Sequence, residues 1–557
     1  MRVEVKKMKE IAKYINTAMG REKSDLILKG GNVVDVFTGG VIRADVMIKD
    51  GVICGVGSYS GENEVDVTNK YVMPTFVDAH IHFESSMVTP AEYAKVAVPH
   101  GITTVVADPH EIANVCGIDG LNYMLSAADN MPLDVMLMLP SCVPATPFEH
   151  SGAVIDAKTT QEIADKFCGI GEMMNYPGII NADSETLGKL CTDIIDGHAP
   201  LLTGHELDAY VSAGIITDHE CSNIEEMTEK LSKGMHVLLR EGTLSKDLAN
   251  LIGGVTPHTL RRCAFCTDDR FVGDIMRRGS IDHCIRMAQR HGVSEIDAII
   301  MATINPCEIY GIKKHGAVAP SYAADIVVAD DLQLGRIDKV YKDGVLVAEN
   351  GKALFETTQP DTSKVINTVH LPKITADFFA HEMPDGEFAA IELLPDTVVT
   401  KKAMAKKGDR LSKVCVIERH HNLGTKGIGY VTNYGITNGA IATSIGHDSH
   451  NVIVIGDNDA DMAHAVNTLG KSGGIAVCSN GEALGYLELD IAGLMSSKTA
   501  DEVIEEHNKL ENMAKKLKIT HKVDPFLSLA FMPLPVIPEI RITDSGLFDV
   551  TKFEFIK

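Results

Sequence analysis

Histidine and carboxylate side chains recur near the ends of short apolar runs in the first half of the chain, and together they can bind divalent metals. The first run, over residues 71–83, contains His80-Ile81-His82 close to its end. Because residues i and i+2 of a strand point to the same face, the two imidazoles can converge on one point. Imidazole and carboxylate ligands suit Zn²⁺, Mn²⁺ or Fe²⁺, and a carboxylate can bridge two such ions. Later runs carry the same ligand types, at Glu172, His198, His219 and Asp268.

Each of these residues also has a simpler explanation when it is taken alone. A single His-x-His is usually accidental, and the adjacent Asp268 and Asp269 could begin a helix as its N-cap. Their common position decides between the two interpretations, because they fall at one end of separate strand-helix units, in an order that one barrel would use. We therefore predict one metal site from His80, His82, Glu172, His198, His219 and Asp268.

The segment that must position these ligands alternates strand-like and helix-like stretches. Eight apolar runs begin near residues 71, 101, 133, 169, 194, 214, 236 and 263, with helical patterns such as 90–100 and 159–167 between them. Repeated β–α units of this size are typical of a parallel sheet. Eight of them over about 250 residues predict a TIM-like (β/α)8 barrel at 75–320, whose active site would lie at the carboxyl ends of the strands.

Two β-rich segments that flank the barrel share the sequence Lys-Asp-Gly-Val, at 49–52 and 342–345. Asp-Gly between apolar runs is a hairpin signal, so we predict that 24–74 and 321–355 pair into one small split β-sandwich domain. Residues 1–23 are expected to form a helical segment and 356–364 a linker. Beyond it we predict an additional α+β domain over 365–557, in which the basic run 401–410 is a solvated loop. The whole chain is thus of the α/β class.

Composition excludes several classes of partner. The 557 residues carry a net charge of −24, which repels nucleic acid and anionic membranes but is compatible with a neutral small substrate. No apolar run approaches the roughly 18 residues of a transmembrane helix, and the first residues lack the apolar region of a signal peptide. Twelve scattered cysteines fit a reducing compartment better than a disulfide framework. We therefore expect a cytoplasmic protein.

The combined motifs resemble a known family. VMPTFVDAHIHFESSM, at 72–87, resembles the first barrel strand of the amidohydrolase superfamily, as does the split β-domain. FESSM, ADPHEIANVCG, GEMMN, DGHAP, TDHE and CTDDR together are similar to the adenine deaminases of bacteria and archaea, and 426–451 resembles the C-terminal domain of that family. The resemblance runs essentially from end to end. Many superfamily members carry a carboxylated lysine on strand four where this chain has Glu172, which argues against a dihydroorotase-like or urease-like protein.

The resemblance implies that adenine and water give hypoxanthine and ammonia, through metal-activated hydroxide attacking C6 of the purine. It also implies a divalent metal, with Mn²⁺ or Fe²⁺ favoured and Zn²⁺ possible, and a homo-oligomer, dimeric or larger. Because six candidate ligands are more than one tetrahedral ion needs, we predict two ions per chain. Asp268 would accept the proton of the water and help protonate the leaving amino group. Asp269 is the reserve for that role and is otherwise expected to contact the substrate, as are Glu84, Ser85 and Asp108. Glu172 would bridge or ligate the metals and relay a proton to the ring, while His80, His82, His198 and His219 would be ligands.

Several assignments stay open at this point. Asp108, His110 and Glu111 follow the second strand run, where they could begin a helix, contact substrate or add metal ligands. Glu84 and Ser85 could bind the purine edge or be ordinary loop polarity. Alternative functions are an amidohydrolase for another cyclic amidine or an N6-substituted adenine, and a non-catalytic scaffold of the same fold.

A final cluster lies far from the barrel in sequence. His447, Asp448 and His450 fall within four residues, in a turn that follows glycine-rich, β-branched sequence. A surface loop would explain them. Because a barrel mouth that excludes water from a reacting purine needs a cover, we expect instead that this loop packs against the mouth and helps to close or line the purine site, with at least one of the three within roughly 10 Å of the metals.

Overall fold

Eight short parallel strands in the middle of the chain join edge to edge into a closed ring. The computed structural model describes residues 2–395, 397–520 and 523–556. In it the ring is built from three small sheets, with the strand orders β6-β7-β8, β9-β10 and β11-β12-β13. The strands are β6 (Phe76–Ile81), β7 (Ile102–Ala107), β8 (Asp134–Leu137), β9 (Ile170–Met173), β10 (Ile195–Gly197), β11 (Thr217–Asp218), β12 (His236–Arg240) and β13 (Cys263–Cys266).

Isolated contacts join the three sheets. A parallel bridge between Leu139 and Ile170 continues the order from β8 to β9, and a backbone hydrogen bond joins β10 to β11. A parallel bridge between Ile81 and Asp268 connects the end of β13 back to β6. The strand order therefore follows the chain order once around the ring. Because all strands run the same way, their eight carboxyl ends meet at one mouth.

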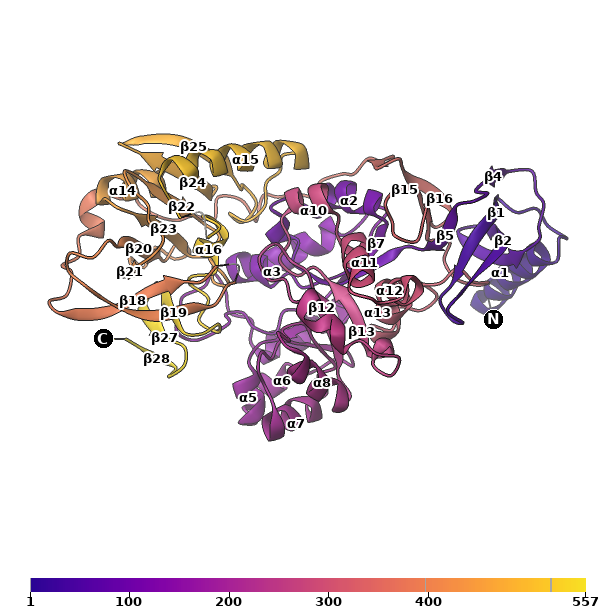
Figure 1. Cartoon of the computed structure of the whole chain (residues 1–557), viewed down its shortest axis with the longest axis horizontal. Helices are drawn as coiled ribbons and strands as arrows, with labels where there is room; N and C mark the ends of the chain where they lie inside the picture. Colours follow the sequence, from indigo (N-terminus) through magenta and orange to yellow (C-terminus); the bar gives the residue numbers. More distant parts are fainter. Residues whose placement is uncertain (1, 396, 521–522, 557) are drawn as a thin grey trace.

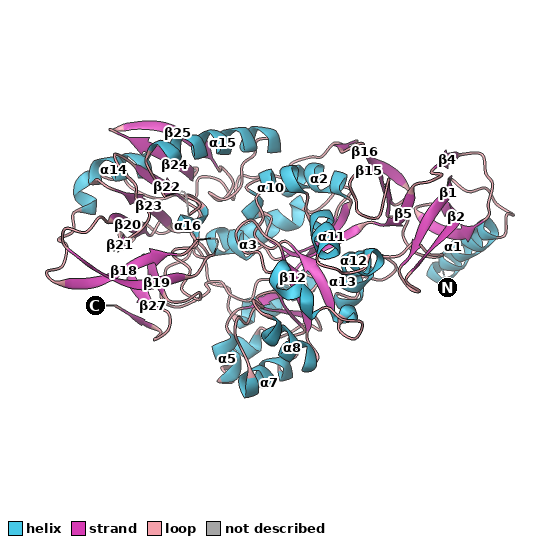
Figure 2. Ribbon diagram, in the orientation of Figure 1, coloured by secondary structure: helices cyan, strands magenta, loops and turns pink. Residues whose placement is uncertain are grey.

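Helices lie around the ring (Figure 2). Every residue of β6 and β7 is buried, as expected when one face of a strand fills the ring and the other packs against helices. The mixed α/β content that the sequence predicts is confirmed. The helices of this region are α2 (Pro90–Ala97), α3 (His110–Ala127), α4 (Ala157–Ile163), α5 (Tyr176–Ile180), α6 (Ser184–Gly188), α7 (Gly204–Ser212), α8 (Ile224–Ser232), α9 (Leu248–Leu251), α10 (Val272–Arg278), α11 (Ile281–Arg290), α12 (Glu295–Ala302) and α13 (Ile304–Ile309).

A nine-stranded sheet at one end of the molecule contains chain segments from both sides of the ring (Figure 1). Val327 of β14 pairs with Met73 of β5, although about 250 residues separate them in sequence. Helix α1 (Arg2–Ala18) packs on β2 and β3. The strands are β1 (Leu26–Asp35), β2 (Gly40–Lys49), β3 (Val52–Gly57), β4 (Glu64–Asp66), β5 (Tyr71–Pro74), β14 (Ile326–Ala329), β15 (Ile337–Lys342), β16 (Val345–Glu349) and β17 (Lys352–Ala353).

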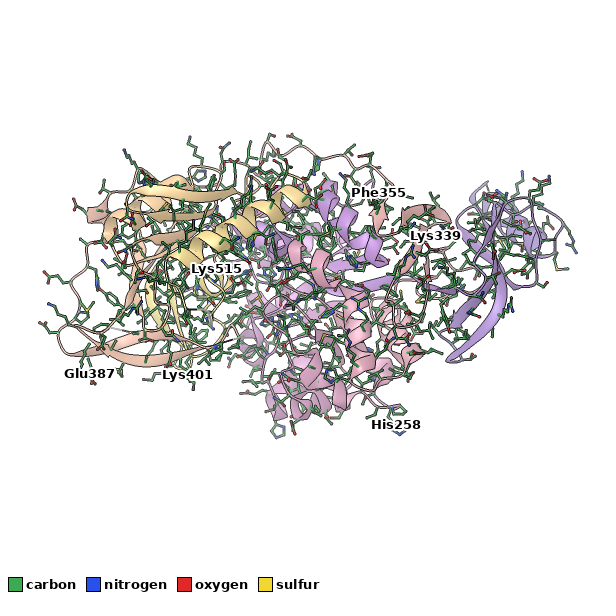
Figure 3. The ribbon with its side chains drawn as sticks, turned by 45° about the horizontal axis from the view of Figure 1, so that its top comes forward. His258, Lys339, Phe355, Glu387, Lys401 and Lys515 are labelled. Atoms are coloured by element: carbon green, nitrogen blue, oxygen red, sulfur yellow. The ribbon has the colours of Figure 1, made fainter. Side chains whose placement is uncertain are left out.

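A second large sheet occupies the opposite end of the molecule, in the order β19-β18-β21-β20-β23-β22-β24-β25. Figure 3 labels Glu387 and Lys401 on its first hairpin and Lys515 on the long helix α15. The elements are β18 (Glu387–Leu393), β19 (Thr400–Lys406), β20 (Ser412–Ile417), β21 (Lys426–Val431), β22 (Ala440–Thr443), β23 (Val452–Gly456), β24 (Gly474–Ser479), β25 (Glu482–Glu488), α14 (Asp459–Thr468), α15 (Ala500–Lys516) and α16 (Leu527–Ala530), followed by the small sheet β26 (Ile540–Thr543), β27 (Gly546–Asp549) and β28 (Glu554–Phe555).

The interpretation of 401–410 as a solvated loop is wrong, because most of this run is the edge strand β19. The strand pairs antiparallel with β18 over its full length. Thr400 and Ala405 are buried, whereas Lys401 and Lys402 are exposed. Lysines on an edge strand keep other chains from pairing with it, so a basic run and a strand are compatible here.

Two observations bear on the environment of the protein. None of the helices in the described part of the chain combines the length and the apolar character needed to cross a membrane. All twelve cysteines are described and none of them forms a disulfide.

A buried lysine holds together the strand ends that carry two of the predicted ligands. Lys230 on α8 is fully buried, and its Nζ donates to Ala199 O at 2.7 Å, Asp218 Oδ2 at 2.9 Å and Glu226 Oε1 at 2.7 Å. Ala199 follows His198, and Asp218 precedes His219. One ammonium group therefore connects α8 to the ends of β10 and β11.

Replacing this lysine should destabilise the protein strongly. Lys230→Met leaves two buried carboxylates unpaired, and removing one partner of a buried ion pair costs about 3–5 kcal/mol. The free energy of unfolding, measured by chemical denaturation, should fall by that amount. Lys233→Met is the matched control, since its ammonium binds Asp208 and Glu229 near the surface and its loss should cost no more than about 1 kcal/mol. Equal losses in the two variants would contradict the role given to Lys230.

Candidate metal centre

The six predicted ligands all lie at the mouth of the ring. His80 is in β6 and Glu172 in β9, and the others stand one or two residues beyond their strand ends. All six side chains are almost completely buried. Five different strands thus deliver His80, His82, Glu172, His198, His219 and Asp268 to one point, with the small exposure expected of groups that line a closed site.

The two histidines of the first strand face Asp268. His80 Nε2 and His82 Nε2 are 3.1 Å apart, and His82 Nε2 is 3.0 Å from Asp268 Oδ1. His82 Nδ1 lies 2.8 Å from Asp108 O. A carbonyl oxygen only accepts, so Nδ1 carries a hydrogen and Nε2 is the nitrogen that faces the carboxylate. In the structure Nε2 donates to Asp268, and once deprotonated it can ligate a metal together with that carboxylate.

The carboxylate of Glu172 lies between two groups of imidazoles. Its Oε1 is 3.5 Å from His82 Nε2 and 3.2 Å from His110 Nδ1. Its Oε2 is 2.6 Å from His198 Nδ1 and 3.2 Å from His219 Nε2. Each carboxylate oxygen thus has its own imidazole partners. This donor set fits one carboxylate shared between two divalent ions, each completed by histidines.

Both acidic ligands are ionised. Burial raises the pKa of Glu172, but the charge of His198 and the hydrogen bond from His110 outweigh it and hold that pKa well below its usual range. Burial likewise raises the pKa of Asp268, whereas the hydrogen bond from His82 and the charge of Arg240 lower it well below normal. Deprotonated carboxylates are the form that binds metals.

A second layer of carboxylates fixes the ligands in place. Asp108 Oδ2 accepts from the backbone N of Glu172 at 2.9 Å. A Cβ at Gly171 would lie 2.1 Å from the same oxygen, so only glycine allows this contact. Asp196 Oδ2 lies 3.5 Å from His80 Nδ1, and its other oxygen accepts from Thr217 Oγ1 at 2.6 Å. Partners of this kind set the orientation and basicity of metal ligands.

Arg240 is a member of the site that sequence reasoning missed. It ends β12, and its Nη1 donates to Asp268 Oδ2 at 2.9 Å. The same guanidinium binds Asp247 and Glu220. Asp268 therefore faces His82 with one oxygen and Arg240 with the other. The sequence signal for Arg240 is its position at a strand end, and a pattern of metal ligands does not include it because arginine is not a metal ligand.

The four predicted substrate contacts divide into two groups. Asp269 lines the cavity beside the ligands, and Ser85 Oγ donates to its carboxylate. Glu84 is buried behind the site, where its Oε1 accepts from Ile112 N at 3.0 Å and burial raises its pKa to about 7. Among the described residues that line the cavity, Asp269 is present, whereas Glu84, Ser85 and Asp108 are not.

The C-terminal region covers the mouth. A cavity of about 40 Å³ lies over the ligands. His447 and Asp448 line it, and both are buried. His447 Nδ1 lies 2.6 Å from Glu111 Oε1, and His450 Nε2 binds the other oxygen of Glu111. The loop thus packs against the barrel rather than standing in solvent. Further lining comes from Val398, Phe531, Leu534 and Ile537.

A larger cavity of about 320 Å³ adjoins the first. It lies between barrel loops, which include Pro200 and Asn250, and C-terminal residues, which include Pro538. The two cavities share five lining residues, namely Glu220, Arg240, Ser245, Val398 and Ile537. The Arg240 guanidinium, bonded to Glu220, stands between the ligands and this outer space.

Comparison with known proteins identifies two matching families. Residues 71–347 match the amidohydrolase family, and residues 393–554 match the adenine deaminase C-terminal domain. Among solved structures, the chain is similar to an enamidase (TM-score 0.45, 16% identity, 59% of this chain and 97% of that chain).

Curated relatives match almost the whole chain. An adenine deaminase of Clostridium acetobutylicum is 45% identical, over 98% of this chain and 100% of that protein. Adenine deaminase 2 of Desulfotalea psychrophila is also 45% identical, over 98% of both chains. An adenine deaminase of Halalkalibacterium halodurans is 43% identical, over 97% of this chain and 96% of that protein. The resemblance drawn from the sequence motifs is thereby confirmed.

The contact between Asp108 and the backbone of Glu172 leads to a test. Asp108→Ala removes the carboxylate that fixes a ligand, and loss of such a partner typically lowers metal affinity about 10- to 100-fold. Chelator competition with elemental analysis measures the change. Asp156→Ala is the control, since it removes only the N-cap of α4 and should cost about 1 kcal/mol of stability without altering metal affinity. Unchanged metal affinity with weaker substrate binding in Asp108→Ala would make Asp108 a substrate contact instead.

Proposed function

The chain belongs to the adenine deaminase family, and we propose that it hydrolyses adenine to hypoxanthine and ammonia at the metal centre. The observation that carries this proposal is the complete ligand set, four imidazoles and two carboxylates, buried at one mouth of the ring. An inactive scaffold would have no need to keep so many buried ionisable groups together, because each costs free energy unless it is paired or bound to a metal.

We assign two divalent ions to the centre. His80, His82, Asp268 and Glu172 would hold one ion, and Glu172, His198 and His219 would hold the other. When bound, such ions lower the pKa of water from about 15.7 toward about 7 and so supply a nucleophile at neutral pH. The family resemblance favours Mn²⁺ or Fe²⁺, and the nitrogen and oxygen donors also suit Zn²⁺.

Asp268 is our candidate for proton transfer. It accepts the proton of the attacking water and returns it to the departing amino group. His82 and Arg240 fix its two oxygens, and its low pKa keeps it ionised. Its neighbour Asp269 differs, because burial and the charge of Asp268 raise the pKa of Asp269. We therefore assign Asp269 to substrate contact, where Ser85 holds it. Glu172 would ligate the metals and pass the second proton of the water to the purine ring.

The C-terminal cover excludes water from the reaction. A water molecule needs about 10–15 Å³ of cavity volume, so the inner cavity of about 40 Å³ has room for only a few. A purine therefore requires the covering side chains to shift. We propose that it arrives through the adjoining cavity of about 320 Å³ and that the loop with His447, Asp448 and His450 closes over it.

The same proposal extends to the architecture. The closed ring supports a TIM-type (β/α)8 barrel at 75–320, and the shared sheet supports one split β-domain from 24–74 and 321–355. The second large sheet supports a separate domain at 365–557, of which residues 396, 521, 522 and 557 lie outside the described part. Helix α1 falls in the predicted segment 1–23, whose first residue also lies outside it. The unpaired cysteines are compatible with our proposal of a cytoplasmic homo-oligomer.

Ammonia release from adenine tests the proposed function. Protein stripped by a chelator should lose activity, and separate reconstitution with Mn²⁺, Fe²⁺ or Zn²⁺ should restore it, with elemental analysis reaching two ions per chain. A panel with other cyclic amidines and N6-substituted adenines serves as the specificity control. If one of those compounds releases ammonia faster than adenine does, that compound and not adenine is the substrate. Active protein that never exceeds one ion per chain would contradict the paired centre.

Substitution of Asp268 tests the proton-transfer assignment. Asp268→Asn keeps the shape of the side chain but cannot accept the proton, so kcat should fall on the order of 100-fold or more. Fold and most of the metal should remain, as checked by thermal unfolding and elemental analysis. Asp269→Asn is the matched neighbour. If Asp269→Asn loses turnover while Asp268→Asn keeps it, the proton acceptor is Asp269.

A further inference from the structure

His447 reaches the reaction cavity from the C-terminal region with its ring fixed from two sides. Its Nδ1 lies 2.6 Å from Glu111 Oε1. Its ring stacks on Phe531, with centroids 4.2 Å apart and an interplanar angle of 7°. Both His447 and Phe531 line the cavity. Because Nδ1 is committed to the carboxylate, Nε2 is the ring nitrogen available to a ligand, and none of the described residues forms a hydrogen bond with it.

We propose that Nε2 of His447 donates a hydrogen bond to a ring nitrogen of the bound purine, so that the C-terminal domain completes the substrate site. The proposal rests on the proposed function. With C6 and its amino group facing Asp268, a purine still presents two ring acceptors, N7 beside the amino group and N3 on the opposite edge. Pockets for small ligands are lined mostly by hydrophobic and aromatic side chains, and Phe531 supplies one beside this donor.

The charges around His447 favour a donor. Glu111 binds it directly, and the carboxylates of Asp269 and Asp448 lie close enough to act on it. Burial lowers the pKa of His447, but the charge and hydrogen bond of Glu111 outweigh this and raise that pKa to about 9. An imidazolium donates from both nitrogens, one to Glu111 and the other into the cavity.

A chain of contacts positions His447. His450 Nε2 donates to the second oxygen of Glu111, since His450 Nδ1 accepts from Gly446 N at 3.3 Å. Arg419, fully buried, donates from Nε to His450 O and from Nη2 to Ala492 O at 2.9 Å. Glu111, His450 and Arg419 are therefore positioning residues that act through His447.

A third metal ion is the competing explanation for this cluster, because Glu111, His447 and His450 present ligand atoms within 4.8 Å of one another. The hydrogen bond from Gly446 N–H to His450 Nδ1 argues against it. That bond places the hydrogen of a neutral His450 on Nε2, where it donates to Glu111 and leaves no lone pair for a metal. The geometry thus favours a hydrogen-bonded arrangement that orients His447 toward substrate.

The test compares adenine with 3-deazaadenine and 7-deazaadenine in the wild type, His447→Ala and His447→Gln, all reconstituted with the same metal. A hydrogen bond to a charged group contributes about 1.5–3 kcal/mol, so His447→Ala should lose about 10- to 100-fold in kcat/KM for adenine. The wild type should lose a similar factor on the analogue that lacks the contacted nitrogen. His447→Ala should show no further loss on that analogue, and the amide of His447→Gln should restore part of the activity.

Controls separate this contact from a structural effect. His464→Ala changes a histidine of α14 that does not line the cavity and should leave kcat/KM unchanged. Hypoxanthine affinity, measured by calorimetry, should fall in His447→Ala while the metal content stays at the wild-type value. If His447→Ala reduces activity on all three bases by the same factor, or loses one ion per chain, the proposed contact is wrong. A wild type that releases no ammonia from adenine overturns the proposed function itself, and the contact with it.

Discussion

The carboxylate of Glu172 is the feature on which the rest of the site depends. Its two oxygens lie within 3.2 Å of imidazoles on opposite sides. This arrangement requires that β9, β10 and β11 end at the same height in the ring. A one-residue shift of β9 would turn this side chain to the other face, because the strand period is two. Gly171 and Asp108 prevent that shift by holding the backbone of Glu172. The register of β9 therefore determines whether Glu172 can reach both groups of imidazoles and serve the metal site.

Burying so many charges demands compensation away from the metals. Lys230 neutralises Asp218 and Glu226 below the ends of β10 and β11, and Arg240 binds Asp268 beside the centre. An unpaired buried charge costs several kcal/mol. Pairing with these cations therefore offsets part of the free-energy cost of burying the carboxylates around the metal site. Lys230 and Arg240 also limit the movement of these elements relative to one another, since each is hydrogen-bonded to more than one of them.

The sequence predicts the ligands better than their surroundings. His80 and His82 follow from the alternation of a strand, and Glu172 from its position at a strand end, because local periodicity determines both. Lys230 and Arg240 were missed, since their roles arise from partners up to 31 residues away that pattern alone does not pair. The sequence leaves Asp108 open among a helix start, a substrate contact and a metal ligand, and it does not show that one oxygen of Asp108 accepts from the backbone N of Glu172. Strand β19 was missed because edge lysines resemble a loop in composition.

The cover of the site is held in a way that lets it act as a unit. Arg541 is buried without a carboxylate partner among the described residues, and its guanidinium donates to the carbonyls of Ile537, Phe531 and Val398. Those same three residues line the cavity. The Arg541 side chain thus joins two separate segments of the cover through backbone oxygens, which carry no net charge. In the opening that we propose for purine entry, a cover joined in this way would move as one piece, and the contact of Glu111 with His447 and His450 would fix its closed position against the barrel.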